Sequence, residues 1–172
     1  ICENSLSLFY NTSNATTNNF EWLINNVPHT SDSVLLSFNS AGNYPVYHKI
    51  TDINGCEDDT AFNFTIRPNP NVAFNFNPTF GQAPLLVNFE NETDSAILNT
   101  WNFGENNQQS NDVNPSYTYT ENGVYNVTLI AENQYGCRDS MLKIINVSPT
   151  ELDVELSNLD YQTITLANGD MV

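Results

Sequence analysis

Two stretches of this chain share one residue pattern, and that repeat constrains the fold more than any other feature. The stretch that ends at Cys56 recurs 81 residues later in the stretch that ends at Cys137. Both contain Gly-x-Tyr-x-Val and then Gly-Cys, at the same spacing. Trp22 lies 34 residues before the first of these cysteines, and Trp101 lies 36 residues before the second. Because such self-similarity indicates one structural unit used more than once, the chain is predicted to contain two copies of that unit.

Each unit has the residue pattern of β-strands throughout. Short runs rich in Val, Ile, Thr, Tyr and Phe are separated by Gly, Pro, Asn and Asp, and no segment keeps helical spacing over three turns. Before Cys137, every second residue is apolar and is expected to point into the core, while the residues between them point to the opposite face. This is the pattern of a strand with one buried face. The expected strands are residues 6–10, 20–24, 34–38, 43–51 and 61–66 in the first unit, and 72–76, 85–90, 97–103, 116–120, 124–132 and 140–147 in the second.

Short strands in units of about 70–80 residues favour antiparallel sandwiches. The predicted fold class is therefore all-β, with tandem Ig-like antiparallel β-sandwiches. Trp22 and Trp101 are each expected at the centre of one core, with Tyr44 and Tyr125 beside them. The expected domains are residues 1–67, residues 70–148 after the linker Pro68-Asn69-Pro70, and residues 151–172 as the truncated start of a further β-sandwich. We expect the chain to be a piece of a longer protein.

The charge balance excludes several classes of partner. Four Lys and Arg residues stand against 20 Asp and Glu residues, the formal net charge is −16, and Asn occurs 29 times. Nucleic acids and anionic membranes attract cationic side chains, so neither is an expected partner. The sequence has no apolar run of about 18 residues, so this segment is not expected to insert into a membrane.

Residues 101–129 carry a motif that points to a family. They contain W-N-F-G-E-N, then N-P-S-Y-T-Y, and then G-V-Y-N-V-T-L. This order resembles the PKD (polycystic kidney disease) domain, whose signature is similar to W-D-F-G-D-G, N-P-x-H-x-Y and G-x-Y-x-V-x-L. Asn102, Glu105 and Asn106 depart from that signature. The first unit, whose W-L-I-N-N lacks the Phe-Gly pair, resembles the PKD or Ig-like repeats of exported bacterial surface proteins more distantly. The resemblance implies an Ig-like sandwich, an extracellular or cell-surface location, and neighbouring domains of the same chain as partners.

Three cysteines leave more than one pairing open. In an Ig-like sandwich, Cys2 is expected at the end where the chain leaves the unit, and Cys56 at the end where the chain enters it. That places them about 20 Å apart, whereas a disulfide needs Cα atoms within about 7 Å. If the units stack head to tail, Cys2 meets Cys137, and Cys56 would pair with a preceding unit. We favour Cys2–Cys137, with Cys2–Cys56 as the alternative and free thiols as a third outcome.

The sequence contains none of the common catalytic motifs, so we predict a chain that is not an enzyme and has no cofactor. His29 and His48 are the only histidines. His48 falls at the inward position that matches Leu129, which favours a partly buried, hydrogen-bonded residue over a catalytic one. His29 lies in a Pro-containing turn, which is typical of plain surface.

Calcium is the one metal that the residue types suggest. Asp52, Asp58 and Asp59 offer the oxygen ligands that Ca²⁺ prefers, but they lack EF-hand spacing, so a solvated turn is the simpler interpretation. A weaker set consists of Asp94, Glu105 and Asp112.

Two further sets of side chains are candidates for contact with sugars. Exposed aromatic residues on a flat sheet can stack on a surface glycan, although a role in the core or in strand formation is the simpler interpretation. The candidates are Tyr47, Tyr117 and Tyr135. Four hydroxyl residues follow Asp and precede Val, Ala or Met, which resembles the O-glycosylation motif of some gliding and gut-dwelling bacteria. They are Ser33, Thr60, Ser95 and Ser140.

The favoured function is that of a non-enzymatic extracellular spacer or presentation module in a large, repeat-built bacterial surface protein, such as an adhesin or a surface filament. One alternative is an accessory module of a secreted hydrolase that binds polysaccharide or protein. Another is a contact element of a secretion or gliding-motility assembly. Glycan binding that is lost when exposed tyrosines are mutated would favour the first alternative, and co-purification with envelope machinery would favour the second.

Overall fold

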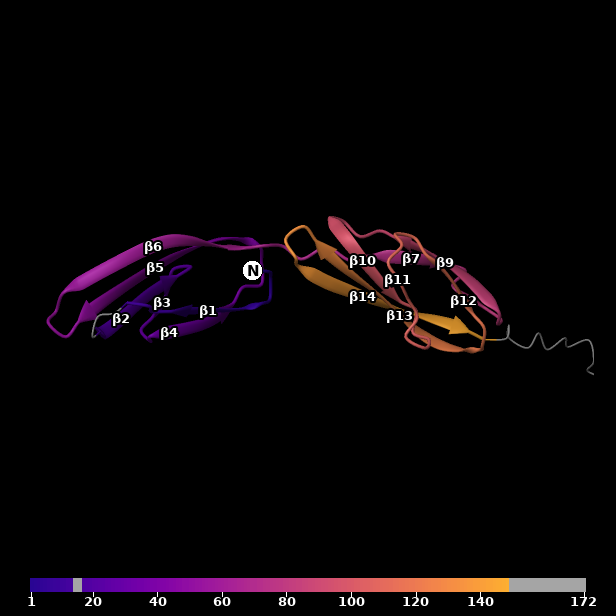
Figure 1. Cartoon of the computed structure of the whole chain (residues 1–172), viewed down its shortest axis with the longest axis horizontal. Coiled ribbons are helices and arrows are strands. Elements are labelled where there is room, and N and C mark those ends of the chain that lie inside the picture. The colour runs from indigo at the N-terminus through magenta and orange to yellow at the C-terminus, as the bar shows by residue number, and fades with distance from the viewer. Residues whose placement is uncertain (14–16, 149–172) are drawn as a thin grey trace, which may run out of the picture.

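The computed structural model describes residues 1–13 and 17–148, and all regular structure in them is β-strand. Two sandwiches lie end to end, unit one at residues 1–67 and unit two at residues 71–148 (Figure 1). None of the described residues forms a helix that could cross a membrane. The third expected domain, with its strands at 153–156 and 162–166, lies outside the described residues.

Unit one is built from two sheets of unequal size. The smaller sheet pairs β1 (Leu6–Tyr10) with β4 (Ser33–Ser37). The larger sheet has the order β3-β2-β5-β6, and its strands are β2 (Thr17–Ile24), β3 (Val27–His29), β5 (Gly42–Asp52) and β6 (Glu57–Ile66). All these pairings are antiparallel. The core between the two sheets contains Phe9, Trp22, Ile24, Val34, Phe38, Val46 and Ile66.

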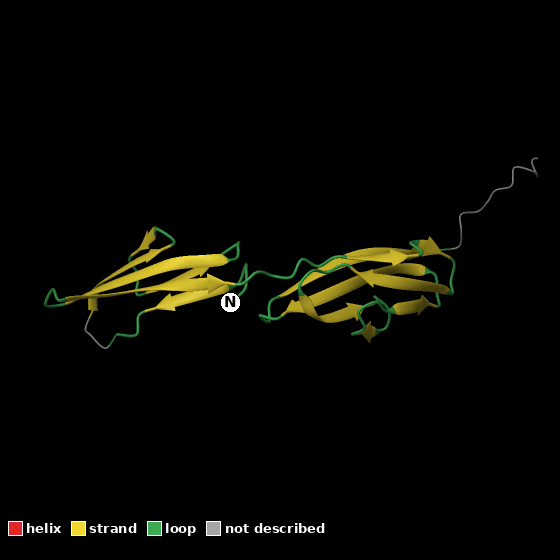
Figure 2. Cartoon of the chain, turned by 90° about the horizontal axis from the view of Figure 1, so that it is seen from above, coloured by secondary structure: helices red, strands yellow, loops and turns green. Residues whose placement is uncertain are grey.

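Unit two has the same plan with more strands, and Figure 2 shows its layers from above. One sheet has the order β12-β9-β7, formed by β7 (Phe74–Asn77), β9 (Leu85–Asn91) and β12 (Ser116–Tyr119). The other has the order β11-β10-β13-β14-β8, and its strands are β8 (Phe80–Gly81), β10 (Ala96–Asn102), β11 (Gln109–Ser110), β13 (Gly123–Asn133) and β14 (Arg138–Val147). The pairing of β14 with β8 is parallel and the others are antiparallel.

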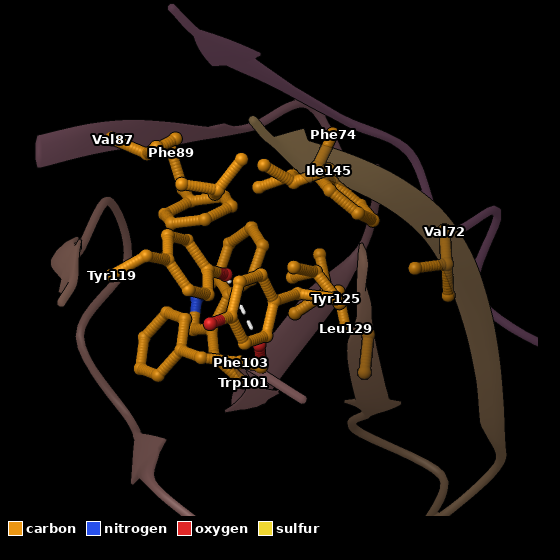
Figure 3. Close-up of a cluster of buried hydrophobic side chains, with 13 residues drawn as sticks. Val72, Phe74, Val87, Phe89, Trp101, Phe103, Tyr119, Tyr125, Leu129 and Ile145 are labelled. Carbon is orange, nitrogen blue, oxygen red and sulfur yellow. Dashed lines mark hydrogen bonds between the residues drawn. The ribbon is translucent and has the colours of Figure 1, made fainter. Parts of the chain in front are cut away.

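Trp101 lies fully buried at the centre of unit two (Figure 3). Its ring lies between Phe74 and Phe89, with centroids 5.1 and 5.4 Å away. Its Nε1 donates a hydrogen bond to the carbonyl of Asp112 at 3.0 Å, which satisfies the one polar atom of the side chain. Nearby, the buried Tyr119 hydroxyl donates to the carbonyl of Phe103 at 3.0 Å.

Trp22 has the equivalent place in unit one, so each tryptophan belongs to its own core. Its Nε1 donates to the carbonyl of Ser31 at 2.9 Å, the counterpart of the bond made by Trp101. The two tyrosines expected in the cores differ in burial. Tyr125 is buried, whereas Tyr44 is half-buried and packs on Phe38 at the margin of the core.

Three details differ from the expectations. His29, expected in a plain surface turn, is the last residue of a strand and is half-buried, and its buried Nε2 has no hydrogen-bond partner among the described residues. The short strands β3, β8 and β11 were not among the predicted strands. The expectation that His48 is hydrogen-bonded is wrong for Nε2, because this buried atom has no hydrogen-bond partner among the residues that the structure describes. The imidazole ring instead stacks on Trp22, with centroids 3.6 Å apart. Aromatic contact has taken the place of a polar one at this position.

Candidate functional site

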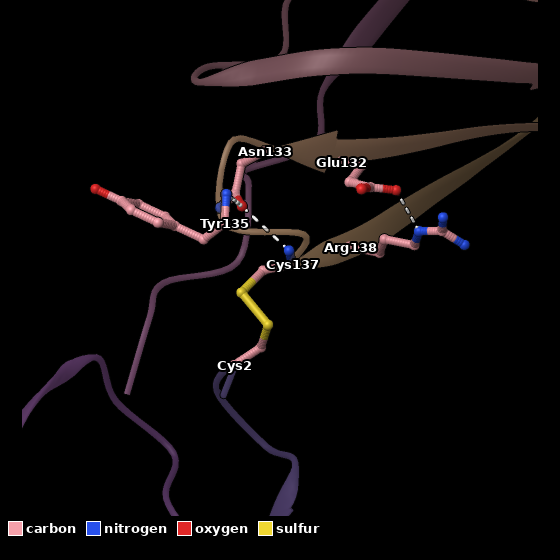
Figure 4. A network of polar contacts seen from close by, with 6 residues as sticks. All are labelled: Cys2, Glu132, Asn133, Tyr135, Cys137 and Arg138. Carbon is pink, nitrogen blue, oxygen red and sulfur yellow. Dashed lines mark hydrogen bonds and ion pairs between the residues drawn. A yellow bond between two sulfur atoms is a disulfide. The ribbon is translucent and has the colours of Figure 1, made fainter. Parts of the chain in front are cut away.

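The two units meet at a joint that contains a disulfide (Figure 4). Cys2 of unit one is bonded to Cys137 of unit two, with Cα atoms 5.5 Å apart. The sulfur of Cys137 is fully enclosed, whereas Cys56 is exposed and has a free thiol. The pairing is therefore the one between units, and Cys2–Cys56 is not formed.

Asn133 shapes the hairpin that presents Cys137. Its Oδ1 accepts hydrogen bonds from the backbone N–H groups of Tyr135 at 3.0 Å and Cys137 at 3.1 Å. Its Nδ2 donates to the carbonyl of Pro68 in the linker at 2.8 Å. Asn133 is 4% exposed, and Gly136 completes the turn with a φ of +76°, a conformation that favours glycine. One buried side chain thus holds both the hairpin and the linker.

Charged side chains of unit one hold the other side of the joint. The Glu3 carboxylate accepts hydrogen bonds from the backbone N–H groups of Ala41 at 2.6 Å and Asn69 at 3.1 Å. The Arg67 guanidinium lies over the Tyr135 ring, 4.7 Å from its centroid, in cation–π geometry. The linker residues are therefore fixed by contacts from both units.

The β5–β6 hairpin of unit one has the same construction without such a partner among the described residues. Asp52 occupies the place of Asn133, and its Oδ1 accepts from the backbone N–H groups of Asn54 and Cys56, both at 2.8 Å. The bond from Cys56 is the largest cause that holds the pKa of Asp52 below its ordinary value. The hairpin therefore presents the exposed Cys56 at the end of unit one that lies away from the joint (Figure 1).

The structure does not bring the calcium candidates together. Asp52 is engaged in its hairpin, while Asp58 and Asp59 are consecutive residues on β6 and so point to opposite faces of the strand. In the weaker set, Glu105 accepts a hydrogen bond from Tyr117 and Asp112 accepts one from Ser110. Across residues 1–13 and 17–148, no group of three or more His, Cys, Asp or Glu side chains is arranged to hold a metal ion.

The tyrosines proposed for glycan stacking do not form a common platform. Tyr117 stacks on Phe103 at 4.4 Å, and its hydroxyl donates to Glu105 at 2.8 Å. Desolvation, followed by this bond, raises the pKa of Tyr117 to about 12. Tyr135 has one face covered by Arg67, and Tyr47 lies on β5 of the other unit. Tyr117 and Tyr135 are therefore each engaged in local contacts, and Tyr47 lies apart from both.

The four hydroxyl residues of the glycosylation motif are all exposed, as a modifying enzyme would require. Ser33 begins β4, Thr60 and Ser140 lie within β6 and β14, and Ser95 lies in a turn. Their modification stays a prediction.

One hollow in unit one had no signal in the sequence. It is an open groove of about 520 Å³ between β1 and β6, with Trp22 and His48 among its lining residues. Phe62 and Tyr10 also line it and are 47% and 62% exposed. The side chains of the joint, Asn133 and Arg67, were also missed, because neither belongs to a motif. The repeat alignment alone could have indicated Asn133, since it pairs that residue with Asp52.

Comparison with known proteins identifies the second unit. The family model described as the PKD domain matches residues 66–148. No curated protein sequence matches the chain.

Three solved structures are among those to which the chain is similar. A structure of carbohydrate-binding modules of the β-sandwich superfamily is 24% identical, with a TM-score of 0.44, and the match covers 48% of this chain and 35% of that one. The PKD1 domain of Vibrio anguillarum Epp is 26% identical, with a TM-score of 0.41, over 47% of this chain and 95% of that one. Fibronectin(III)-like modules of Clostridium thermocellum CbhA are 10% identical, with a TM-score of 0.42, over 88% and 90%.

Proposed function

We propose, on the premise that residues 66–148 form a PKD domain, that this chain is an extracellular, non-enzymatic module that holds other parts of a larger surface protein at a fixed distance and orientation. The observation that carries the proposal is the Cys2–Cys137 disulfide between the two units. Structural disulfides persist in oxidising compartments, which supports a location outside the cytoplasm.

The joint supports a fixed orientation because the units are attached at two places. Domains connected by a linker alone are expected to move relative to one another. Here the linker 68–70 provides one covalent connection and the disulfide provides a second. The Asn133–Pro68 hydrogen bond and the Arg67–Tyr135 contact add to these two connections and further restrict rotation.

The environment of His48 supports a non-enzymatic role. A catalytic histidine needs a nucleophile and an orienting group within hydrogen-bond reach. Within residues 1–13 and 17–148, the Nε2 of His48 has no hydrogen-bond partner, and its ring stacks on Trp22. Burial lowers the pKa of His48, which favours the neutral imidazole, and the ring packs in the core.

Residual dipolar couplings of the full chain test the fixed orientation. We expect one alignment tensor to fit the amides of both units in the oxidised protein. Cys2→Ser combined with Cys137→Ser should leave both units folded and require two different tensors. Cys56→Ser is the matched control, because it removes a thiol from the equivalent hairpin without touching the joint. Two tensors in the oxidised protein, or one in the double variant, would contradict the proposal.

A further inference from the structure

Lys143 connects the last strand of unit two to the first. It lies on β14 between the inward-facing Met141 and Ile145, so its side chain starts between the two sheets. Its Nζ lies over the ring of the buried Phe74 of β7, 5.2 Å from the centroid. Nζ donates hydrogen bonds to the backbone carbonyl of Phe74 and to Oδ1 of Asn75, the latter at 3.0 Å. The lysine therefore brings its amine directly to a side-chain amide of the opposite sheet.

The amide of Asn75 is held on its other side by a carboxylate. Its Nδ2 donates to Oε1 of Glu92 at 2.6 Å, while its Oδ1 accepts from Lys143. Glu92 directly follows β9, and its backbone N–H donates to the carbonyl of Ala73 at 2.9 Å, which keeps this residue beside β7. An amine, a primary amide and a carboxylate therefore lie in one row, contributed by β14, β7 and the end of β9.

Lys143 differs from the other lysine of the chain in its partner. Lys49 forms a salt bridge with Glu57 at 2.8 Å. The two salt bridges within residues 1–13 and 17–148 are this one and Arg138–Glu132, so neither includes Lys143. A carboxylate in contact with Nζ would keep the amine in an ion pair and turn it away from the amide. Here the amine contacts carbonyl oxygens instead, as an attack on the amide carbon requires.

We propose that Lys143 and Asn75 react to form an amide bond between their side chains, which joins β7 covalently to β14. Nζ gives up one proton to solvent and attacks Cγ of Asn75. The bond from Cγ to Nδ2 then breaks, and Nδ2 leaves as ammonia, which takes up a proton and becomes ammonium. One C–N bond forms and one breaks, so the reaction needs no oxidant, reductant or further reactant.

The distances are close to those that the reaction needs. Oδ1 of Asn75 lies 3.0 Å from Nζ, and a C=O bond is about 1.23 Å long, so Cγ lies within about 4.2 Å of Nζ. Reacting atoms in a productive arrangement are about 3–3.5 Å apart, so a small rotation of the Asn75 amide suffices. Because folding holds both groups on strands of one unit, the attack is intramolecular and does not depend on a chance encounter.

Glu92 is placed to move the proton that this exchange of nitrogens requires. In the tetrahedral intermediate, Nζ and Nδ2 are both bonded to Cγ, so a carboxylate in contact with Nδ2 also reaches Nζ. It can accept a proton from Nζ and deliver it to Nδ2, which leaves more readily once protonated. The structure thus supplies the nucleophile, the amide and the proton carrier, and the new bond joins residues that are 68 positions apart.

Mass spectrometry of the full oxidised chain tests the proposal. We expect the intact mass to be lower, by the mass of one ammonia molecule, than the mass calculated from the sequence with its disulfide. A protease digest should contain a branched fragment in which the segment around Asn75 is joined to the segment around Lys143. The fragment is needed because an Asn-Gly pair such as Asn54-Gly55 can also lose ammonia by cyclising, but that loss creates no branch.

Two lysine variants provide a matched pair. Lys143→Arg keeps the positive charge but replaces the amine by a guanidinium, which stays protonated and does not attack an amide. It should restore the calculated mass and abolish the branched fragment. Lys49→Arg should leave both results as in the wild-type chain, because that lysine is paired with Glu57 in unit one. Asn75→Ala, at an exposed position, should also abolish the fragment and serves if Lys143→Arg does not fold.

Glu92→Gln tests the proton carrier. Its side-chain amide keeps an acceptor for Nδ2 of Asn75 but cannot take up and deliver a proton. In a time course after cell-free synthesis, the branched fragment should therefore appear about a hundredfold more slowly than in the wild-type chain.

A wild-type chain with the calculated mass and no branched fragment would overturn the proposal. So would an ammonia loss that persists in Lys143→Arg, because the ammonia would then come from another residue. An unchanged rate in Glu92→Gln would show that the assignment of the proton carrier is wrong.

Discussion

At the scale of single residues, the two units differ most at the neighbour of the tryptophan. Trp22 lies opposite His48 on the adjacent strand, whereas Trp101 lies opposite Leu129. The sequence predicted an inward His48 from its match to Leu129, and the residue is 8% exposed. The missing hydrogen bond could not be predicted, because it depends on which polar atoms the folded core places near Nε2. Desolvation lowers the pKa of this histidine, since burial disfavours the charged ring.

We expect acidification below about pH 6.5, the ordinary pKa of histidine, to destabilise unit one through His48. Above that pH the ring is neutral in both the folded and unfolded states and contributes no pH dependence. As the pH falls, the unfolded chain binds a proton that the folded chain does not, so the free energy of unfolding decreases until the lowered folded-state pKa is reached. Urea unfolding between pH 5 and 8, followed by the Trp22 and Trp101 indole signals in NMR spectra, separates the two units.

His48→Leu is the control for this titration, because it installs the residue of the equivalent position in unit two. The variant should lose the part of the pH dependence that only unit one shows. If the Trp22 signal keeps the same dependence in His48→Leu, other groups of unit one cause it and the assignment to His48 is wrong.

Gly104 explains why the W-N-F-G motif ends in glycine. Its φ is +76°, and a Cβ at this position would lie 2.6 Å from the backbone oxygen of Asn126. Gly104→Ala should therefore destabilise unit two by about 1–2 kcal/mol from the backbone conformation and by about 1–3 kcal/mol more from the collision. Gly55→Ala is the comparison, because its φ is +83° but no atom lies within 4 Å of the added Cβ. Chemical denaturation should show a clearly larger loss for Gly104→Ala, and equal losses would mean that the close approach has no energetic effect.

At the scale of elements, alternation and turn residues predicted the long strands well. The expected strand 6–10 coincides with β1, and 85–90 and 116–120 each differ from β9 and β12 by one residue at one end. The strands that were missed are two or three residues long. β3 contains a proline and β8 is a Phe-Gly pair, so neither has a period that a sequence can reveal. Such strands form because a neighbouring strand offers backbone partners.

The joint was predictable only in part. The direction of the strands favoured Cys2–Cys137 but left alternatives, because the distance between two cysteines depends on how the units stack. No sequence motif indicated the contact of Asn133 with the linker. The side-chain amide donates to a carbonyl 65 residues away in the sequence, so the neighbouring residues carry no sign of it. The groove beside β1 was also not predictable, because an unpaired strand edge is a property of the assembled sheets.

We expect Asn133→Asp to weaken the joint and keep the hairpin. The Oδ1 acceptor for Tyr135 and Cys137 remains, as it does at Asp52 in unit one, but the donor to Pro68 is replaced by an acceptor. A buried group left without its partner costs about 1–3 kcal/mol, so the free energy of unfolding of unit two should fall by that order. Urea unfolding at pH 7 measures the loss.

Asp52→Asn is the reciprocal control for this change. It makes the hairpin of unit one like that of unit two, at a place where no linker contacts it among the described residues. Its effect on stability should be small, and a loss as large as that of Asn133→Asp would show that the hairpin bonds, rather than the linker bond, are responsible.

At the scale of the whole molecule, the charge is strongly negative and little of it is compensated. All four cationic side chains already have a partner: Lys49 pairs with Glu57, Arg138 pairs with Glu132, Arg67 lies over Tyr135, and Lys143 bonds β7. Most acidic residues within 1–13 and 17–148 therefore have no cation beside them, and their mutual repulsion opposes the compact state.

Added salt should therefore stabilise the chain. Raising NaCl from about 0.01 to 0.15 M shortens the screening length from about 30 to 8 Å, which weakens repulsion between surface carboxylates. A gain of about 1 kcal/mol would raise Tm by about 4–8 °C in a domain of this size. Calorimetric scans at pH 7 in both salts measure the shift. A Tm that stays constant or falls would show that the carboxylates are too far apart to matter.

The disulfide also decides how a pull on the chain would travel. Tension applied between Ile1 and Ser148 passes from Cys2 directly into Cys137 and then along β14. Unit one and most of unit two therefore carry none of the applied force. In optical-tweezer stretching with handles at those residues, the oxidised chain should lengthen only by the short stretch after Cys137. Reduction of the Lys143→Arg variant should release the 135-residue separation between the cysteines, or roughly 450–490 Å of additional contour length. In its oxidised state the protein would behave as a nearly inextensible link that shields two folded sandwiches from stretching.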